Sequence, residues 1–222
     1  MSADTLGSHG LCPELQCKRK GILMIKILKY SEIDDSAIFN RSLASSDVAE
    51  TVSEIIADVR KRKDAALRDY SLRFDKSELD SLEVTREEIQ VAVDSTDPEL
   101  IDIMKESSEN IRHFHEKQVR SDFVITDKPG IVLGQRIIPM ERVGLYVPGG
   151  SASYPSSVLM NCIPAKIAGV KEIIITTPSH GGYVNPVILA AAEIAGADKI
   201  FKVGGAQAVA ALAYGTESIP KV

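Results

Sequence analysis

The most constraining feature of this 222-residue chain is a threefold alternation of apolar strand, glycine-containing loop and helix in residues 141–222. Apolar, β-branched runs occur at 143–147, 172–176 and 199–203, and a helical pattern follows each one. Near-continuous apolar strands that alternate with helices are typical of a parallel sheet covered on both faces. The expected fold class is therefore α/β, with an incomplete Rossmann-like parallel sheet and helices on both faces.

A change in composition predicts a domain boundary near Pro139 to Glu141. Residues 141–222 hold 11 of the 57 charged residues but 10 of the 15 glycines. Their net charge is +1, which leaves −6 for residues 1–140 and gives the total of −5. We therefore expect an incomplete, helix-rich α/β domain over residues 24–140 before the sheet domain over residues 141–222.

Helical patterns dominate residues 47–118. An apolar face repeats with helical spacing at Val48, Val52, Ile55, Ile56 and Val59. A second helix is expected near Asp64, and a third at the capping box of Thr85–Glu88. Asp97 followed by Pro98 starts a helix that runs to about Gln118. The side chains predicted to face inward on the second and last of these helices are Leu67, Tyr70, Phe74, Leu100, Ile103, Met104, Ile111 and Phe114.

Shorter signals predict the remaining elements. Two strands, Phe123–Ile125 and Ile131–Leu133, flank a turn at residues 127–130. In the sheet domain, helices are expected from Ser156 to Ala168 and from Asn185-Pro186 to Gly196, with an alanine-rich helix ending at Gly215.

Residues 1–23 are expected to be a disordered leader, with Met24 as the natural start and a first strand at Ile25–Leu28. The net charge of −5 argues against nucleic acid or an anionic membrane as the main partner. No apolar run approaches the ~18–20 residues that a membrane helix requires. Three sparse cysteines favour a reduced, cytoplasmic setting.

The first candidate site lies at the end of the strand over residues 143–147. Tyr146 offers a flat ring and a hydroxyl there, and Gly149-Gly150 would let the backbone approach a ligand or adopt positive φ. Ligands of open α/β sheets bind beyond the carboxyl ends of the strands. The alternative is a tight turn beside a core tyrosine, and the spacing is not that of a G-x-G-x-x-G dinucleotide loop.

The second candidate site follows the strand over residues 199–203. Gly204-Gly205 precedes a helix whose first amides favour an anion or a polar ligand edge. Gln207 would project from the first turn with a donor and acceptors. The alternative is simple helix capping with an exposed glutamine.

Other reactive side chains are explained by ordinary structural roles. The serines at 151, 153, 156 and 157 lack an evident base and orienting group, which argues against a serine hydrolase. His113 and His115 point about 200° apart on a helix, so they cannot share a metal ion. Cys162 lies among apolar residues and is expected to be inert core.

Several segments resemble the histidinol dehydrogenase family in the same order. They are Val59–Leu67, Asn110–Glu116, Arg142–Gly150, Val158–Gly169, Val203–Ala208 and Ala211–Thr216. The resemblance extends from about Ile25 to Val222, which makes it specific. It implies a zinc- and NAD-dependent enzyme that oxidises L-histidinol through the aldehyde to L-histidine, in which Tyr146 and Gln207 match positions that contact NAD.

The resemblance also implies what this chain does not carry. The family's third NAD contact, its zinc ligands, its acid/base pair and its substrate-binding residues would lie beyond Val222. No catalytic or metal-binding residue is therefore assigned in the chain, and the 222 residues alone are expected to lack dehydrogenase activity. The family forms homodimers, and an exposed apolar face where the missing strands should dock would promote association, so we expect a dimer or aggregation.

Two alternatives remain open. The first is a related zinc- and NAD-dependent dehydrogenase that acts on another amino- or sulfo-alcohol. The second is a non-catalytic fragment that pairs with a separate C-terminal half.

Overall fold

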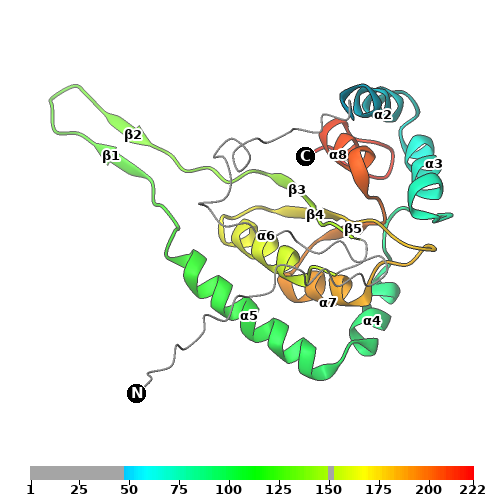
Figure 1. The fold of residues 1–222 in the computed structure, drawn as a ribbon. Helices are drawn as coiled ribbons and strands as arrows, with labels where there is room; N and C mark the ends of the chain where they lie inside the picture. Colours follow the sequence, from blue (N-terminus) through cyan, green and yellow to red (C-terminus); the bar gives the residue numbers. More distant parts are fainter. Residues whose placement is uncertain (1–47, 150–152) are drawn as a thin grey trace, which may run out of the picture. The chain divides into compact units, whose positions relative to one another are not determined.

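The computed structural model describes residues 48–149 and 153–222. The leader, the strand at Ile25–Leu28, Gly150 and Ser151 lie outside the described residues. Three parallel strands form the central sheet in the order β3–β4–β5 (Figure 1). They span Arg142–Tyr146, Glu172–Thr176 and Lys199–Phe201. The predicted α/β class with a parallel sheet is confirmed.

Both faces of the sheet are buried. Ile173 and Ile175 of β4 belong to one apolar core, with α6 (Pro155–Ile167) and α7 (Pro186–Ala195). Ile174, which points to the opposite face, belongs to a second core with α8 (Gly205–Tyr214). Helix α8 lies so close to β3 that a Cβ added at Gly144 would come within 2.7 Å of the Leu212 side chain. Glycine therefore permits this helix–strand contact.

Four helices precede the sheet and extend the same two cores. They are α2 (Val48–Arg62), α3 (Asp64–Asp75), α4 (Arg86–Ser95) and α5 (Pro98–Glu116). Helices α2 and α3 pack against α8, whereas α4 packs against α7 and α5 packs against α6 and α7 (Figure 1). Each core thus contains residues from both sides of residue 140. The domain boundary predicted near Pro139 to Glu141 rests on a change in composition, and it stays a prediction.

Helix starts and ends follow the predicted signals closely. The Thr85 side chain accepts a hydrogen bond from the Glu88 amide, and the Glu88 carboxylate accepts one from the Thr85 amide. The Asp97 and Asn185 side chains cap α5 and α7, each one residue before a proline. Gly196 ends α7 with a left-handed φ of 76°. Local side-chain chemistry therefore determines where these helices begin and end.

Three residues predicted to face inward are exposed instead. Ile103, Phe114 and Phe74 are 52%, 64% and 49% exposed, whereas Met104 is 3% exposed. One helical step turns a side chain by about 100°. Because Met104 points from α5 into the core, its neighbour Ile103 points away from it. Apolar residues occur on more than one side of α5, so periodicity alone did not identify the packed side.

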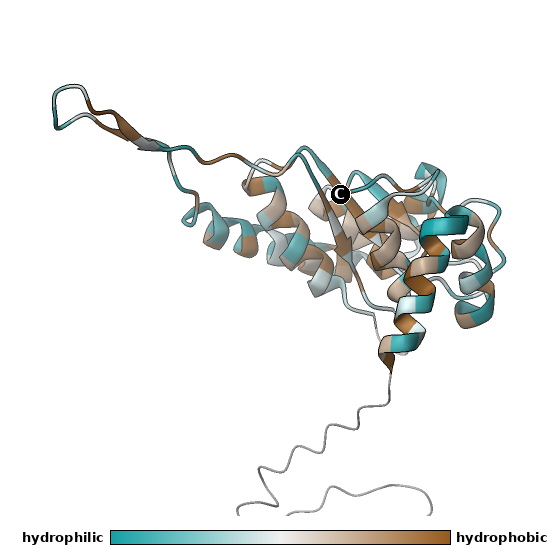
Figure 2. Cartoon of the chain, turned by 90° about the horizontal axis from the view of Figure 1, so that it is seen from above, coloured by the Kyte–Doolittle hydropathy of each residue, from teal (hydrophilic) through white to brown (hydrophobic). Residues whose placement is uncertain are grey.

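The predicted pair of strands forms an exposed antiparallel hairpin. Strand β1 (Phe123–Ile125) is as predicted, whereas β2 (Leu133–Gln135) begins two residues later than expected. All six strand residues are exposed, and Figure 2 shows hydrophobic colouring along both strands of the hairpin. Its apolar side chains are thus not buried by the rest of the described chain.

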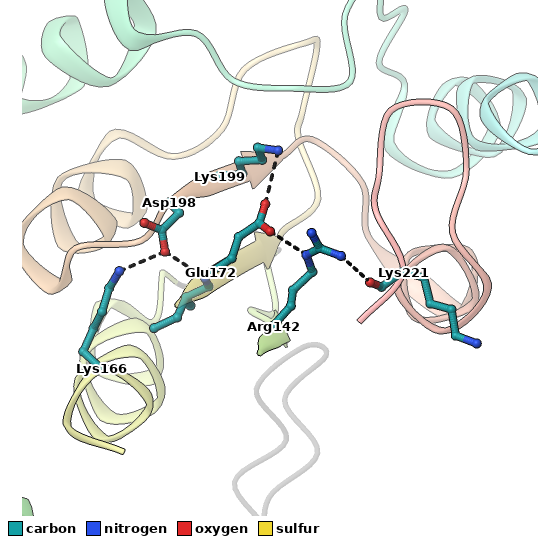
Figure 3. A network of polar contacts seen from close by, with 7 residues as sticks. Arg142, Lys166, Glu172, Asp198, Lys199 and Lys221 are labelled. Atoms are coloured by element: carbon teal, nitrogen blue, oxygen red, sulfur yellow. Dashed lines mark hydrogen bonds and ion pairs between the residues drawn. The ribbon is translucent and has the colours of Figure 1, made fainter. Parts of the chain in front are cut away.

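An ion-pair network joins the strands at their amino ends (Figure 3). Glu172 of β4 accepts from Arg142 of β3 at 2.6 Å and pairs with Lys199 of β5 at 3.2 Å. Asp198 accepts from Lys166 and from the Ile173 amide, both at 2.8 Å. These contacts involve all three strands and help to hold their register. No helix in the described part of the chain is long and apolar enough to cross a membrane.

The segment after α8 is tied to the start of α3 by Asp64. The carboxylate of Asp64 accepts from the Ser218 amide at 3.3 Å and from the Ser218 hydroxyl, and the Asp64 amide donates to Glu217 at 3.0 Å. Burial by itself raises the pKa of Asp64, but hydrogen bonds from Ser218 and Thr216 hold that pKa below its ordinary value of 3.8. The ionised form is therefore the one that the fold stabilises.

We expect Asp64→Asn to lower the free energy of unfolding at pH 7 by about 1–3 kcal/mol, because it removes a hydrogen-bonded, buried carboxylate. The folded-state pKa is depressed, so this stabilisation is complete above the unfolded pKa and is lost as pH falls through the folded value. Urea unfolding between pH 7 and pH 2.5 measures it. Ser218→Ala should show a smaller loss with the same trend, and a pH-independent difference between wild type and Asp64→Asn would contradict the assignment.

Candidate functional site

Tyr146 stands at the carboxyl end of β3 on the α8 face of the sheet. It is two residues beyond Gly144, which contacts α8, so the alternation of the strand puts both on one face. The residue is 42% exposed. Its hydroxyl accepts a hydrogen bond from the Gly205 amide at 3.3 Å. Tyr146 therefore contacts the start of α8.

Gln207 lies in the first turn of α8 and is only 1% exposed. Its amide packs against Gly205, where an added Cβ would lie 2.7 Å from Gln207 Oε1. Gly205 has a φ of 65°, so a side chain there would be strained as well as crowded. The structure thus brings Tyr146 and Gln207 together around Gly205, and it shows Gln207 buried rather than projecting from the helix.

The glycines Gly149 and Gly204 both lie against Pro178. A Cβ added at either would come within 2.5 Å of the Pro178 ring, which follows β4. Neither glycine has a positive φ. Pro178 of the same chain therefore fills the space that their missing side chains leave.

A cleft of about 620 Å³ opens beyond the carboxyl ends of β3 and β4. Pro178 lines it and also contacts Gly204, so the cleft borders the region of Tyr146 and Gln207, although neither residue lines it. Its lining residues are Phe74, Asp75, Pro148, Gly149, Ser153, Thr177, Pro178, Ser179, His180, Tyr183, Val184, Asn185, Pro186 and Ile188.

Asp75 is an acidic residue of this cleft that the sequence patterns did not single out. It is the last residue of α3, and its Oδ2 atom is buried and has no hydrogen-bond partner in the part of the chain that the structure describes. Burial raises the pKa of Asp75, and the charge of His180 partly opposes that rise. The available signal was an acidic residue at the negative end of a helix, an unfavourable place for a carboxylate.

The remaining candidates are held in ordinary structural roles. His113 is exposed, and His115 is hydrogen-bonded to Gln118 at 2.7 Å. Cys162 is fully buried, and burial raises the pKa of its thiol to about 12. Ser156 and Ser157 lie in the first turn of α6, and Ser153 lines the cleft. The core position predicted for Cys162 is confirmed.

Comparisons with known proteins identify one family. A profile described as histidinol dehydrogenase matches residues 39–222. Histidinol dehydrogenase of Methanosarcina barkeri is 49% identical over 203 residues, 90% of this chain and 47% of the relative. That of Clostridium acetobutylicum is 48% identical over 205 residues, 90% of this chain and 48% of the relative. The chain thus spans about half the length of the curated relatives it matches.

A solved structure gives the same result. The crystal structure of histidinol dehydrogenase from Elizabethkingia anophelis superposes with a TM-score of 0.77 at 37% sequence identity. The match covers 80% of this chain and 41% of that one. The similarity therefore extends from sequence to fold.

The packing of Pro178 against Gly149 predicts a rescue. Gly149→Ala should lower the free energy of unfolding by about 1–3 kcal/mol, because the new methyl meets the proline ring. Pro178→Ala removes the clashing ring atoms, so the double variant should lose less than the two single losses together. Urea unfolding of wild type, the two single variants and the double variant measures the free energies of this double-mutant cycle. Simple additivity would show that the ring is not what excludes a side chain at residue 149.

Proposed function

The chain belongs to the histidinol dehydrogenase family, and on that premise we propose that it forms the nucleotide-binding part of an NAD-dependent oxidation. The proposed substrate is L-histidinol, which is converted through the aldehyde to L-histidine. The observation that carries the proposal is the convergence of Tyr146 and Gln207 at Gly205, on one edge and one face of the sheet.

The chemistry of these two side chains suits a nicotinamide nucleotide. When bound, NAD supplies the hydride acceptor of the reaction. Tyr146 offers a half-exposed ring and a hydroxyl, and Gln207 offers a carboxamide with donors and acceptors. Gln207 is held by packing, so its hydrogen-bonding groups are oriented before a ligand arrives. The role proposed for this chain is to position the nucleotide.

The zinc implied by the resemblance does not fit the described residues. In residues 48–149 and 153–222, no group of three His, Cys, Asp or Glu side chains could hold a metal ion. We therefore assign the residues of this chain to the nucleotide alone.

The proposal is tested by producing the chain together with the unmatched part of the Methanosarcina barkeri relative, with zinc, NAD and L-histidinol. We expect NADH to form. Gln207→Met, which keeps the side-chain volume but removes the amide, should raise the KM for NAD about tenfold by removing a buried hydrogen-bonding group.

Val209→Ala is the matched control, because Val209 lies on the exposed side of α8 and is 53% exposed. It should leave the KM for NAD unchanged. A soluble complex that produces no NADH from L-histidinol would count against the proposed function.

We also propose that a second copy of the chain packs on the β1–β2 hairpin, as in a homodimer. The support is the exposed apolar surface of this segment: Val124 is 68%, Val132 71% and Leu133 61% exposed. Such a concentration of exposed apolar side chains marks an interaction surface.

Val124→Lys should convert a dimer to a monomer, because it places a charge in that apolar contact. Light scattering after size exclusion measures the mass. Ser121→Lys, which adds the same charge just before β1, should leave the dimer intact. A wild-type chain that remains monomeric at tens of micromolar would refute the proposal.

A further inference from the structure

Asp75 combines two unfavourable features at one wall of the cleft. It ends α3, where the helix dipole opposes a negative charge. Its Oδ2 atom is also buried and has no hydrogen-bond partner among residues 48–149 and 153–222, and burial raises the pKa of the carboxyl. A native fold seldom keeps such costs together without a functional reason.

Hydrogen bonds near Asp75 hold its backbone carbonyl but do not involve its Oδ2 atom. The Ser77 hydroxyl donates to the Asp75 carbonyl at 3.3 Å. The same hydroxyl accepts from the Ser179 hydroxyl at 3.0 Å and from the Gly182 amide at 3.1 Å. The loop after β4 is thereby tied to the end of α3. Asp75 is thus held on the cleft wall with acceptor capacity unused at Oδ2.

The other walls of the cleft suit a flat ring. Phe74 is about half exposed there, and Pro148, Pro178 and Pro186 add apolar faces. A nucleoside has both an apolar, flat base and a pair of ribose hydroxyls that donate hydrogen bonds. The last torsion of an aspartate side chain is soft, so a small rotation turns Oδ2 toward such a donor.

We infer that Asp75 is a specificity-determining residue, whose carboxylate accepts hydrogen bonds from ribose hydroxyls of the nucleotide in this cleft. The inference rests on the proposed function, since it presupposes that the nucleotide is bound at this edge of the sheet. A carboxylate in this role also repels a phosphate on the ribose. The site therefore selects NAD over NADP.

The experiment is saturation-transfer NMR at pH 7.5 on the 222-residue chain, titrated in parallel with NAD and with NADP. Wild type should prefer NAD. Asp75→Asn should weaken NAD binding about tenfold and bring the preference close to unity, because it removes the charge. Asp75→Asn should fold at least as well as wild type, since it removes the negative charge from the end of α3 and from a buried position.

The affinities for NAD and NADP are measured on the same protein preparation, so their ratio does not depend on the fraction of folded protein. Asp80→Asn is the matched control, because it removes a charge from an exposed aspartate outside the cleft lining, and it should behave as wild type. If Asp75→Asn keeps the preference while Gln207→Met weakens NAD, the inference fails and the proposed function stands. If wild type binds neither nucleotide, the inference fails, and NADH formation by the complex decides the proposed function.

Discussion

The architecture depends on a single constraint: the middle strand of the sheet is shielded from water on both sides. Residues 173–175 of β4 are fully buried, and their side chains alternate between the two cores. A parallel strand in this position requires a helix layer over each face. Helices α6 and α7 supply one layer and α8 the other, and the four helices of the N-terminal half thicken both. Loss of either layer would expose apolar surface that the sheet cannot cover itself.

Much of this arrangement could be predicted from local chemistry. The capping residues Thr85, Asp97 and Asn185 start helices where expected, because a side-chain acceptor next to orphan amides is a local signal. The inward side of α5 was not predictable in the same way. It is determined by where α6 and α7 lie, and apolar residues such as Ile103 and Phe114 occur on the sides that those helices leave uncovered.

In the candidate site, too, some features follow from local sequence and others from tertiary packing. Strand ends and glycines predicted a site at the edge of the sheet beyond which the cleft opens, because parallel strands share that edge. Which atoms fill the space beside each glycine is a tertiary question. Pro178 fills it at Gly149 and Gly204, and only Gly205 needs a backbone conformation that favours glycine. Asp75 was not predicted, because the free-energy cost of its carboxylate arises from burial at the end of α3. A sequence shows neither burial nor an oxygen without a partner.

The ion pairs around Glu172 have a consequence for how the sheet tolerates change. They join the strands at the amino ends, through Arg142 and Lys199, at the opposite end from the cleft. Strand alignment is thus supported away from the loops that border the ligand edge. A change in those loops outside Gly149, Gly204 and Gly205, where added side chains would clash, leaves this support of the strands intact, which would allow one scaffold to be adapted to different small molecules.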